Sequence, residues 1–231
     1  MLDGRTLVLG ISGSPRGEAS CSEKMLKQFL CYVKKHGGET RLLRLKDKRI
    51  FPCEGCYSET KSGEKCSWPC IHDGQDKTTE VLETIIEADS VVISSNVEWG
   101  NVSSLLAILR SKMTCVENNS EEIKKKKGKD PFSGKPLGMI FSQDSEGASL
   151  AYSSFMWGMM QMGFLIPPYG CIFKPSILNK SLAKIGLRVM GYRKLEWIDT
   201  TMESMAWNMV QMPRLFQEHN FNLKGDEEPR C

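Results

Sequence analysis

The sequence lacks long apolar segments and has only a small excess of charge. No run is apolar for long enough to span a bilayer, and no charged segment followed by an apolar core marks a secretory signal. The net charge of +3 over 231 residues gives no electrostatic reason to expect nucleic acid or a membrane surface as the main partner. No Ser–His–acid arrangement or paired-carboxylate pattern stands out. We therefore expect a cytoplasmic protein without a hydrolytic triad.

Apolar segments of two different periods alternate along the chain. Runs of buried-strand type occur at 6–11, 39–45, 90–95 and 137–141, with weaker candidates for a fifth strand at 164–166 and 170–173. Helical spacing occurs at 25–33, 81–86, 105–113, 148–162 and 202–209. This alternation predicts an α/β fold, with a parallel sheet and helices on both of its faces.

We expect residues 1–231 to form one domain, because this length is enough for one sizeable core. A C-terminal helical extension begins at about residue 174. The lysine run 124–129 is interpreted as a solvated loop. Parallel sheets bind ligands beyond the carboxyl ends of their strands, at the point where the strand order reverses. The loops after Ile11, Ser95 and Phe141 are therefore the candidate site.

The first of these loops, residues 10–22, has the chemistry of a phosphate site. Gly13 lets the backbone approach an anion, Arg16 supplies a charged donor, and the free N–H groups of the following helix start face the same place. The hydroxyl donors are Ser12, Ser14, Ser20 and Ser22. A capping box of Ser20 and Glu23 is the alternative. It leaves the other serines and Arg16 unexplained, so a phosphate site is favoured.

Gly13-Ser14-Pro15-Arg16, followed by a small polar cluster that opens a helix, resembles the NADPH-dependent FMN reductase family. Residues 96–103 are similar to that family's Pro-x-Tyr-Trp-Gly-x-x-Ser stretch, which lies against the isoalloxazine ring. Asn96 and Glu98 depart from it, and a glutamate near the flavin would disfavour the anionic reduced form. The resemblance covers roughly residues 6–171. It implies a flavodoxin-like, doubly wound sheet of five parallel strands in the order 2-1-3-4-5, with FMN as cofactor and NAD(P)H as co-substrate.

The resemblance also assigns residues to the flavin. The phosphate contacts would come from Ser12, Ser14, Pro15, Arg16, Ser20, Cys21 and Ser22. The ring contacts would come from Asn96, Val97, Glu98, Trp99, Gly100 and Asn101. The third loop would reach the flavin edge through Ser142, Asp144 and Gly147. Because this family is generally oligomeric, we expect a homodimer or homotetramer that uses part of the apolar helix 148–162.

Four cysteines share one short window, as Cys53-x2-Cys56-x9-Cys66-x3-Cys70. Thiolates at such spacings can converge on one metal centre. The window resembles the cysteine motif of the iron–sulfur flavoproteins, in which four cysteines bind a 4Fe–4S cluster beside FMN. That motif has a third cysteine where this chain has Glu59, so Cys66 and Cys70 would be displaced ligands. Zinc, or a remnant loop without metal, are the alternatives. His72 follows Cys70 closely and could serve as a substitute metal ligand. A histidine in a surface loop is the more common case.

These features predict an FMN-dependent oxidoreductase or electron-transfer flavoprotein. In the resembled family, electrons pass from NAD(P)H through the flavin to a small-molecule or protein acceptor, and the protein supplies no acid–base catalyst. The alternative is a non-enzymatic flavodoxin-like scaffold that has lost FMN and serves as a metal-binding or interaction module. Asn96 and Glu98 favour that alternative.

Overall fold

The structure is a computed structural model that describes residues 5–58, 66–143, 147–175 and 196–218. Its centre is a sheet of five strands: β1 (Leu7–Ser12), β2 (Glu39–Arg44), β3 (Ser90–Asn96), β4 (Leu137–Gln143) and β5 (Cys171–Pro175). The strands lie in the order β2-β1-β3-β4-β5, and every neighbouring pair is parallel. The doubly wound order 2-1-3-4-5 is thus confirmed.

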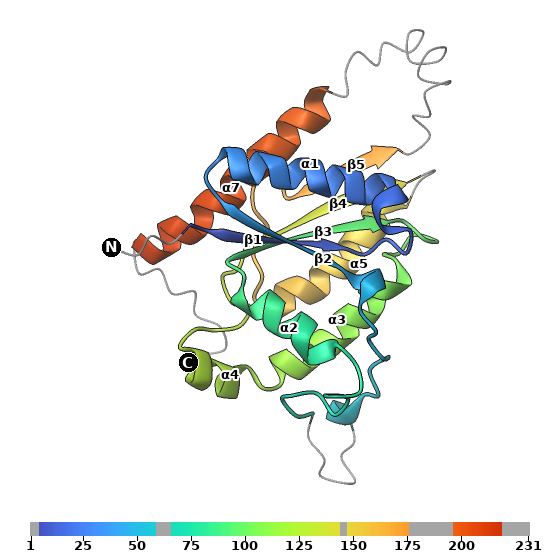
Figure 1. The fold of residues 1–231 in the computed structure, drawn as a ribbon, viewed down its shortest axis with the longest axis vertical. Coiled ribbons are helices and arrows are strands. Elements are labelled where there is room, and N and C mark those ends of the chain that lie inside the picture. Colours follow the sequence, from blue (N-terminus) through green and yellow to red (C-terminus); the bar gives the residue numbers. More distant parts are fainter. Residues whose placement is uncertain (1–4, 59–65, 144–146, 176–195, 219–231) are drawn as a thin grey trace, which may run out of the picture.

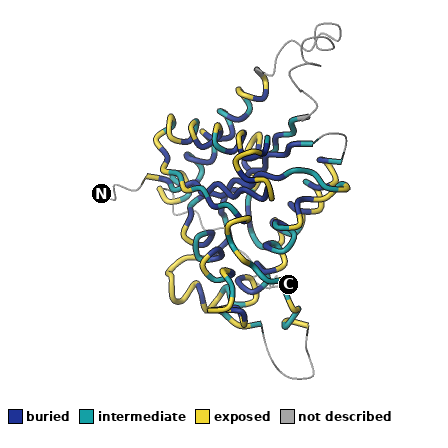
Figure 2. The backbone as a smooth tube through the Cα atoms, turned by 45° about the vertical axis from the view of Figure 1, so that its right-hand side comes forward, coloured by how far each residue is buried: buried dark blue, intermediate teal, exposed yellow. Residues whose placement is uncertain are grey.

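Helices cover both faces of the sheet (Figure 1). One face carries α1 (Cys21–Lys35) and α7 (Glu196–Glu218), and the other carries α2 (Thr78–Glu87), α3 (Ser104–Glu117) and α5 (Ala148–Gln161). Strand side chains alternate between the faces: Val8 and Val92 pack with α1 and α7, whereas Leu9 and Ile93 pack with the other helices. The central strands β1, β3 and β4 are therefore buried on both sides, whereas the edge strand β2 is partly exposed. The exposed residues of the helices lie on their outer surfaces (Figure 2).

The helix α7 is an integral part of the core. Its fully buried residues, Met205, Ala206, Met209 and Val210, pack on the sheet and on α1. A side chain on Gly138 of β4 would meet Met205 Sδ at 2.8 Å, so the glycine lets this helix approach the strand closely. The helix expected near the C-terminus is present as α7. The extension was expected from about residue 174, but β5 continues to Pro175.

Two of the expectations about secondary structure are wrong. The lysine run lies mostly in a helix, α4 (Ser120–Lys127), and not in a loop. Two glutamates occupy its first turn, its lysines the last, and Gly128 ends it in the left-handed conformation, so both helix ends are stabilised. The segment 164–166 is not a strand: Leu165 makes one isolated bridge to Pro136, and β5 is the later candidate.

The connections that the structure describes contain three short 3-10 turns: η1 (Gly17–Ala19), η2 (Leu45–Asp47) and η3 (Cys56–Ser58). Across the described part of the chain, no helix has the length and apolar character that crossing a membrane requires.

We expect Met209→Ala to lower the free energy of unfolding by about 2–5 kcal/mol, because it leaves a cavity between α7 and the sheet. Trp207→Ala, on the half-exposed side of the same helix, is the control, with a loss below about 1 kcal/mol. Urea denaturation followed by circular dichroism measures both. If α7 belongs to the proposed single domain, each variant unfolds in one transition; a separate transition for α7 would contradict it.

Candidate functional site

The loops after β1 and β3 are joined by Ser103. Its hydroxyl donates to the Gly13 carbonyl at 2.7 Å, and its N–H donates to Ser95 Oγ at 3.0 Å. The same hydroxyl caps α3 by accepting from Leu106 N. A side chain on Gly13 would meet Leu106 Cδ1 at 2.4 Å, so only glycine lets the first loop pack on the start of this helix. The two loops therefore form one unit at the carboxyl edge of the sheet.

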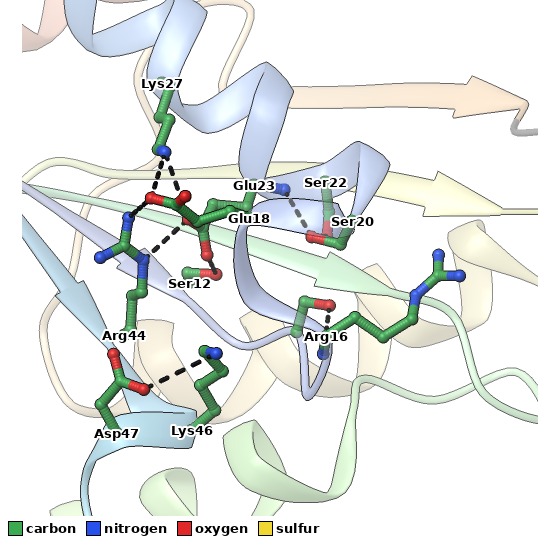
Figure 3. Close-up of polar contacts among 11 residues, drawn as sticks. Ser12, Arg16, Glu18, Ser20, Ser22, Glu23, Lys27, Arg44, Lys46 and Asp47 are labelled. Carbon is green, nitrogen blue, oxygen red and sulfur yellow. Dashed lines mark hydrogen bonds and ion pairs between the residues drawn. The ribbon is translucent and has the colours of Figure 1, made fainter.

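Ser20 is the N-cap of α1, as the capping alternative predicts. Its hydroxyl accepts from Glu23 N at 3.1 Å, and the Ser22 hydroxyl donates to it at 3.4 Å (Figure 3). The reciprocal half of the capping box is not formed, since the N–H of Ser20 donates to the Gly17 carbonyl. The carboxylate of Glu23 points instead toward Ser12 and Arg44.

Two serines that a cap could not explain have partners within the chain. The Ser12 hydroxyl donates to Glu23 Oε2 at 2.8 Å, and Ser14 Oγ accepts from Arg16 N at 3.3 Å. A hydroxyl has only one hydrogen, so Ser12 has none left to offer a phosphate, whereas Ser14 keeps its own. The structure thus removes Ser12 from the donor set in this arrangement.

The remaining donors of the loop lie on its open side. The first-turn N–H groups of Cys21 and Ser22 have no acceptor within the helix. The exposed Arg16 side chain extends on the side of Ser20 and Ser22, away from Glu23 (Figure 3). Its neighbour Pro15 is exposed as well. These groups make a positively polarised edge.

Glu23 is fully buried, yet its charge is matched. Arg44 Nε lies 2.8 Å from Glu23 Oε1, and Lys27 Nζ lies 3.7 Å from it. The hydrogen bond to Glu23 and the charge of Glu18 raise the pKa of Arg44, which stays charged. An anion bound at the start of α1 would therefore not face an unpaired carboxylate.

The ring-contact loop is a tight turn from Glu98 to Asn101. These two residues exchange backbone hydrogen bonds, both of 2.9 Å, and Trp99 and Gly100 between them have φ values of 50° and 72°. Two left-handed residues in a two-residue turn favour glycine at one of them. The Trp99 side chain is fully exposed. The turn thus presents an aromatic ring at the edge of the site.

The two departures from the family pattern contact each other. Asn96 Nδ2 donates to Glu98 Oε1 at 2.6 Å, which leaves Asn96 Oδ1 buried and without a partner among the described residues. Val97, between them, donates its N–H to the Ser142 carbonyl at 3.1 Å. A buried acceptor without a donor is costly, so this oxygen is an unsatisfied hydrogen-bonding group of the loop after β3.

The third loop is described only in part. Ser142 is buried at the end of β4, Gly147 caps α5 with a φ of 111°, and Asp144 lies outside the described residues. A side chain on Gly147 would meet Gly100 Cα at 3.1 Å, so this loop packs against the tryptophan turn. The sequence reading missed Gln143, whose Oε1 accepts from Ala148 N at 3.0 Å.

The four cysteines of the window lie near one another. Burial raises the pKa of Cys56, and the neighbouring Cys53 and Cys70 thiols raise it further. Burial likewise raises the pKa of Cys66, with added contributions from Cys56 and Cys70. All four are free thiols. The fold therefore gathers these thiols, although 17 positions separate the first from the last.

The C-terminal half of α3 and the turn that follows it line this cluster, which no sequence pattern predicted. Asn119 Nδ2 donates to the Cys66 carbonyl at 2.8 Å, and Cys115 Sγ donates to the Ser67 carbonyl at 3.1 Å. Lys112 Nζ lies 3.5 Å from Cys70 Sγ. The sequence feature that could have indicated this role is Lys112 itself, because it is a lysine within the apolar stripe of the predicted helix 105–113.

His72 is buried, so the surface interpretation is wrong. Its Nε2 lies 2.7 Å from Glu54 Oε1, its Nδ1 lies 2.7 Å from Lys112 Nζ, and its ring packs edge-on against Phe51. A pocket of about 370 Å³ opens beside it, lined by Phe51, Pro52, Cys53, Glu54, His72 and Gln75.

The cluster does not form a preformed site for a single ion. A tetrahedral ion with 2.3 Å bonds to sulfur needs thiolates about 3.8 Å apart. Among the described residues, no three His, Cys, Asp or Glu side chains are grouped so that one ion could bind them. Four gathered thiols beside a buried cation do match the donor chemistry of a thiolate-bound iron–sulfur cluster.

Comparisons with known proteins identify the family of this chain. A sequence profile described as NADPH-dependent FMN reductase matches residues 6–174. The chain belongs to this family. An iron–sulfur flavoprotein of Methanocaldococcus jannaschii is 37% identical over 102 residues, which cover 44% of this chain and 49% of that protein. One from Methanosarcina thermophila is 28% identical over 121 residues, covering 52% and 59%. The chain thus spans about half the length of the curated relatives it matches.

Solved structures of low identity share the fold of this family member. The crystal structure of RosB with bound 8-demethyl-8-formylriboflavin-5'-phosphate superposes with a TM-score of 0.68 at 19% identity, covering 94% of this chain and 82% of that one. An NADH:FMN oxidoreductase in its apo form gives a TM-score of 0.53 at 14% identity, covering 87% and 88%. They support the flavodoxin-like architecture.

Asp76 anchors the cysteine segment to α2, and we expect Asp76→Ala to lower stability by about 1–3 kcal/mol. Its carboxylate accepts from Phe51 N, Thr78 N and Thr78 Oγ1, each at 2.8 Å. Burial opposes the charged form, but these hydrogen bonds outweigh it and hold the pKa of Asp76 below its ordinary value.

Because this pKa is lower in the folded than in the unfolded chain, the stabilisation is present above the ordinary aspartate pKa of about 4. It is lost as the pH falls through the folded-state value. Urea denaturation at neutral and acidic pH should show the gap between wild type and Asp76→Ala closing in acid. The exposed Asp73 gives the control variant, Asp73→Ala, and equal losses in both variants would contradict this role.

Proposed function

We propose that this chain binds FMN at the carboxyl edge of its sheet and works as an FMN-dependent oxidoreductase that uses NAD(P)H. The observation that carries the proposal is the joined pair of loops after β1 and β3, linked by Ser103 and Gly13. These strands are neighbours at the point where the strand order reverses. Ligands of doubly wound sheets bind at that point.

The phosphate of FMN would bind at the start of α1. The free N–H groups of Cys21 and Ser22, the hydroxyl of Ser14, and the Arg16 guanidinium provide neutral and charged donors there. Ser20 supports the site as the helix cap, and Ser12 does so by orienting Glu23. The phosphate set is thus narrower than the sequence predicted.

The isoalloxazine ring would lie against the second loop. The ring carries one N–H donor, and the unpartnered Asn96 Oδ1 is an acceptor of the kind that it needs. Trp99, Gly100 and Asn101 form the turn beside this oxygen, and Ser142, Asp144 and Gly147 belong to the adjoining loop. Bound FMN supplies hydride and single-electron chemistry, while these residues bind and orient it and exclude water.

The four cysteines would hold a 4Fe–4S cluster that takes single electrons. Support comes from the gathered thiols, from the buried cation beside Cys70, and from relatives that are called iron–sulfur flavoproteins. The final acceptor would be a small molecule or another protein. Trp157 and Met160 on α5 are large exposed side chains, as a homodimer or homotetramer contact through this helix requires.

One observation favours a different function. Glu98 stays bonded to Asn96, and a carboxylate at this place disfavours a negatively charged reduced flavin. A flavodoxin-like scaffold that has lost FMN and serves as a metal-binding or interaction module accounts for the pair without a flavin.

The two proposals differ in FMN binding, which Arg16→Ala tests. Removing a charged hydrogen bond to phosphate should raise the Kd for FMN about tenfold or more. Quenching of flavin fluorescence during titration with apoprotein measures this Kd. The control is Arg41→Ala, because Arg41 pairs with Glu87 on the surface at 3.2 Å.

Equal affinity in wild type and Arg16→Ala would contradict the phosphate assignment. A wild-type protein that binds no FMN and oxidises no NAD(P)H would favour the scaffold function instead.

The cluster has its own test in Cys56→Ser. Anaerobically reconstituted wild type should hold about four iron atoms per chain and absorb broadly at about 400 nm. Cys56→Ser should lose most of both signals, because serine is a poor ligand for iron in such clusters. Cys31→Ser, which changes an exposed cysteine of α1, should match wild type. Iron content that is the same in all three proteins would contradict the assignment.

A further inference from the structure

Lys112 is the most deeply buried cation of the cysteine region. Only 1% of the residue is exposed, and it projects from the middle of α3 into the space beneath the cysteine segment. Its ammonium group lies 2.7 Å from His72 Nδ1 and 3.5 Å from Cys70 Sγ. A neutral imidazole and a neutral thiol carry no negative charge, so neither partner forms an ion pair with Lys112.

The carboxylates of this region are occupied elsewhere. Glu54 contacts the far nitrogen of His72 at 2.7 Å, and Asp76 lies 3.9 Å from its near nitrogen. Asp76 already accepts three hydrogen bonds from Phe51 and Thr78. Among the described residues, no carboxylate forms a direct ion pair with Lys112.

A buried ammonium without a direct anionic partner costs several kcal/mol. The other buried lysine, Lys135, shows the usual solution: its Nζ donates to the Ile85 and Ile86 carbonyls at 2.6 and 2.9 Å, at the negative end of α2. Lys112 has no such carbonyls. Its contacts are those of a cation placed to meet negative charge on sulfur.

The segment around it is built to hold this arrangement. Cys70 and His72 belong to one turn, closed by hydrogen bonds from Asp73 N to the Cys70 carbonyl and from Asp76 N to the His72 carbonyl. Because the turn is fixed at both ends, both side chains stay directed at Lys112.

We propose that Lys112 is a positioning residue for the cysteine site: its charge compensates a thiolate-bound iron–sulfur cluster, and its N–H donates to the sulfur of Cys70. This inference rests on the proposed cluster. Hydrogen bonds to the sulfurs and nearby charge set the potential of such clusters. The positive charge of Lys112 favours the more negative, reduced form, so it raises the midpoint potential and helps to retain the cluster. His72 holds the ammonium in place from the other side.

The test compares Lys112→Met with wild type in two states of the full chain. Methionine has a similar length without the charge. In the iron-reconstituted protein, we expect lower iron retention during gel filtration with a chelator. We also expect the equilibrium constant for reduction of the cluster to fall about tenfold. This corresponds to a fall of about 59 mV in the midpoint potential of a one-electron couple. Anaerobic dithionite titration, followed by electron paramagnetic resonance, measures this midpoint.

In the metal-free protein, the same substitution should leave the unfolding midpoint in urea unchanged or raise it, because it removes a buried charge that has no direct ion pair. A lysine with only a structural role would give the opposite result. Lys135→Met is the matched control: it should lower stability in both states and leave the cluster potential unchanged.

The outcomes separate this inference from the one on which it rests. A wild-type chain that binds no iron would overturn the cluster and the role of Lys112 together. Iron binding in both chains with equal retention and midpoint would overturn the role of Lys112 alone. A Lys112→Met chain that does not fold without metal would also overturn it.

Discussion

The hydrogen bond from Ser103 to the Gly13 carbonyl is the constraint on which the candidate site depends. It ties the loop after β1 to the start of α3, and Ser95 holds the same serine from β3. The absence of a side chain on Gly13 is required for this contact, because a Cβ atom would overlap Leu106. The positions of the proposed phosphate donors and of the tryptophan turn therefore depend on one buried serine and not on loop conformation alone.

The same helix extends from this junction to the cysteines. Lys112 lies about 13 Å along the helix axis from Ser103 at 1.5 Å per residue. A rigid helix thus sets the separation between the proposed flavin site and the proposed cluster. The two ends differ in their electrostatics. The proposed flavin end holds a buried carboxylate, Glu23, that is matched by Arg44. The cysteine end holds a buried ammonium that, among the described residues, forms no direct ion pair with a carboxylate.

The alternation of strands and helices was predictable from apolar spacing, because a strand buried on both faces and an amphipathic helix leave different patterns. The strand order followed from the family resemblance. Local patterns also located the three loops and the cysteine window. Local patterns failed where a residue's contact partner is distant in the sequence. They also failed where a run of like charges was taken for a loop. Lys112 contacts Cys70 across 42 positions, and Ser12 contacts Glu23 around a loop. The lysine run of α4 was interpreted as a loop because a run of lysines alone does not indicate a helix. The lysines stabilise the helix C-terminus only together with the glutamates one turn earlier and with Gly128.

The departures at Asn96 and Glu98 are better understood as one change than as two. A proline at position 96 has no side-chain donor, so Glu98 would lose its 2.6 Å hydrogen bond and stand as a half-buried carboxylate without that partner. With asparagine, the carboxylate is satisfied and the amide oxygen becomes the free acceptor of the site. The pair thus replaces the tyrosine and proline of the family pattern with a hydrogen-bonded unit of different polarity. At the proposed flavin site this unit would alter the local electrostatics, while the turn at Trp99 and Gly100 is held by the backbone hydrogen bonds between Glu98 and Asn101.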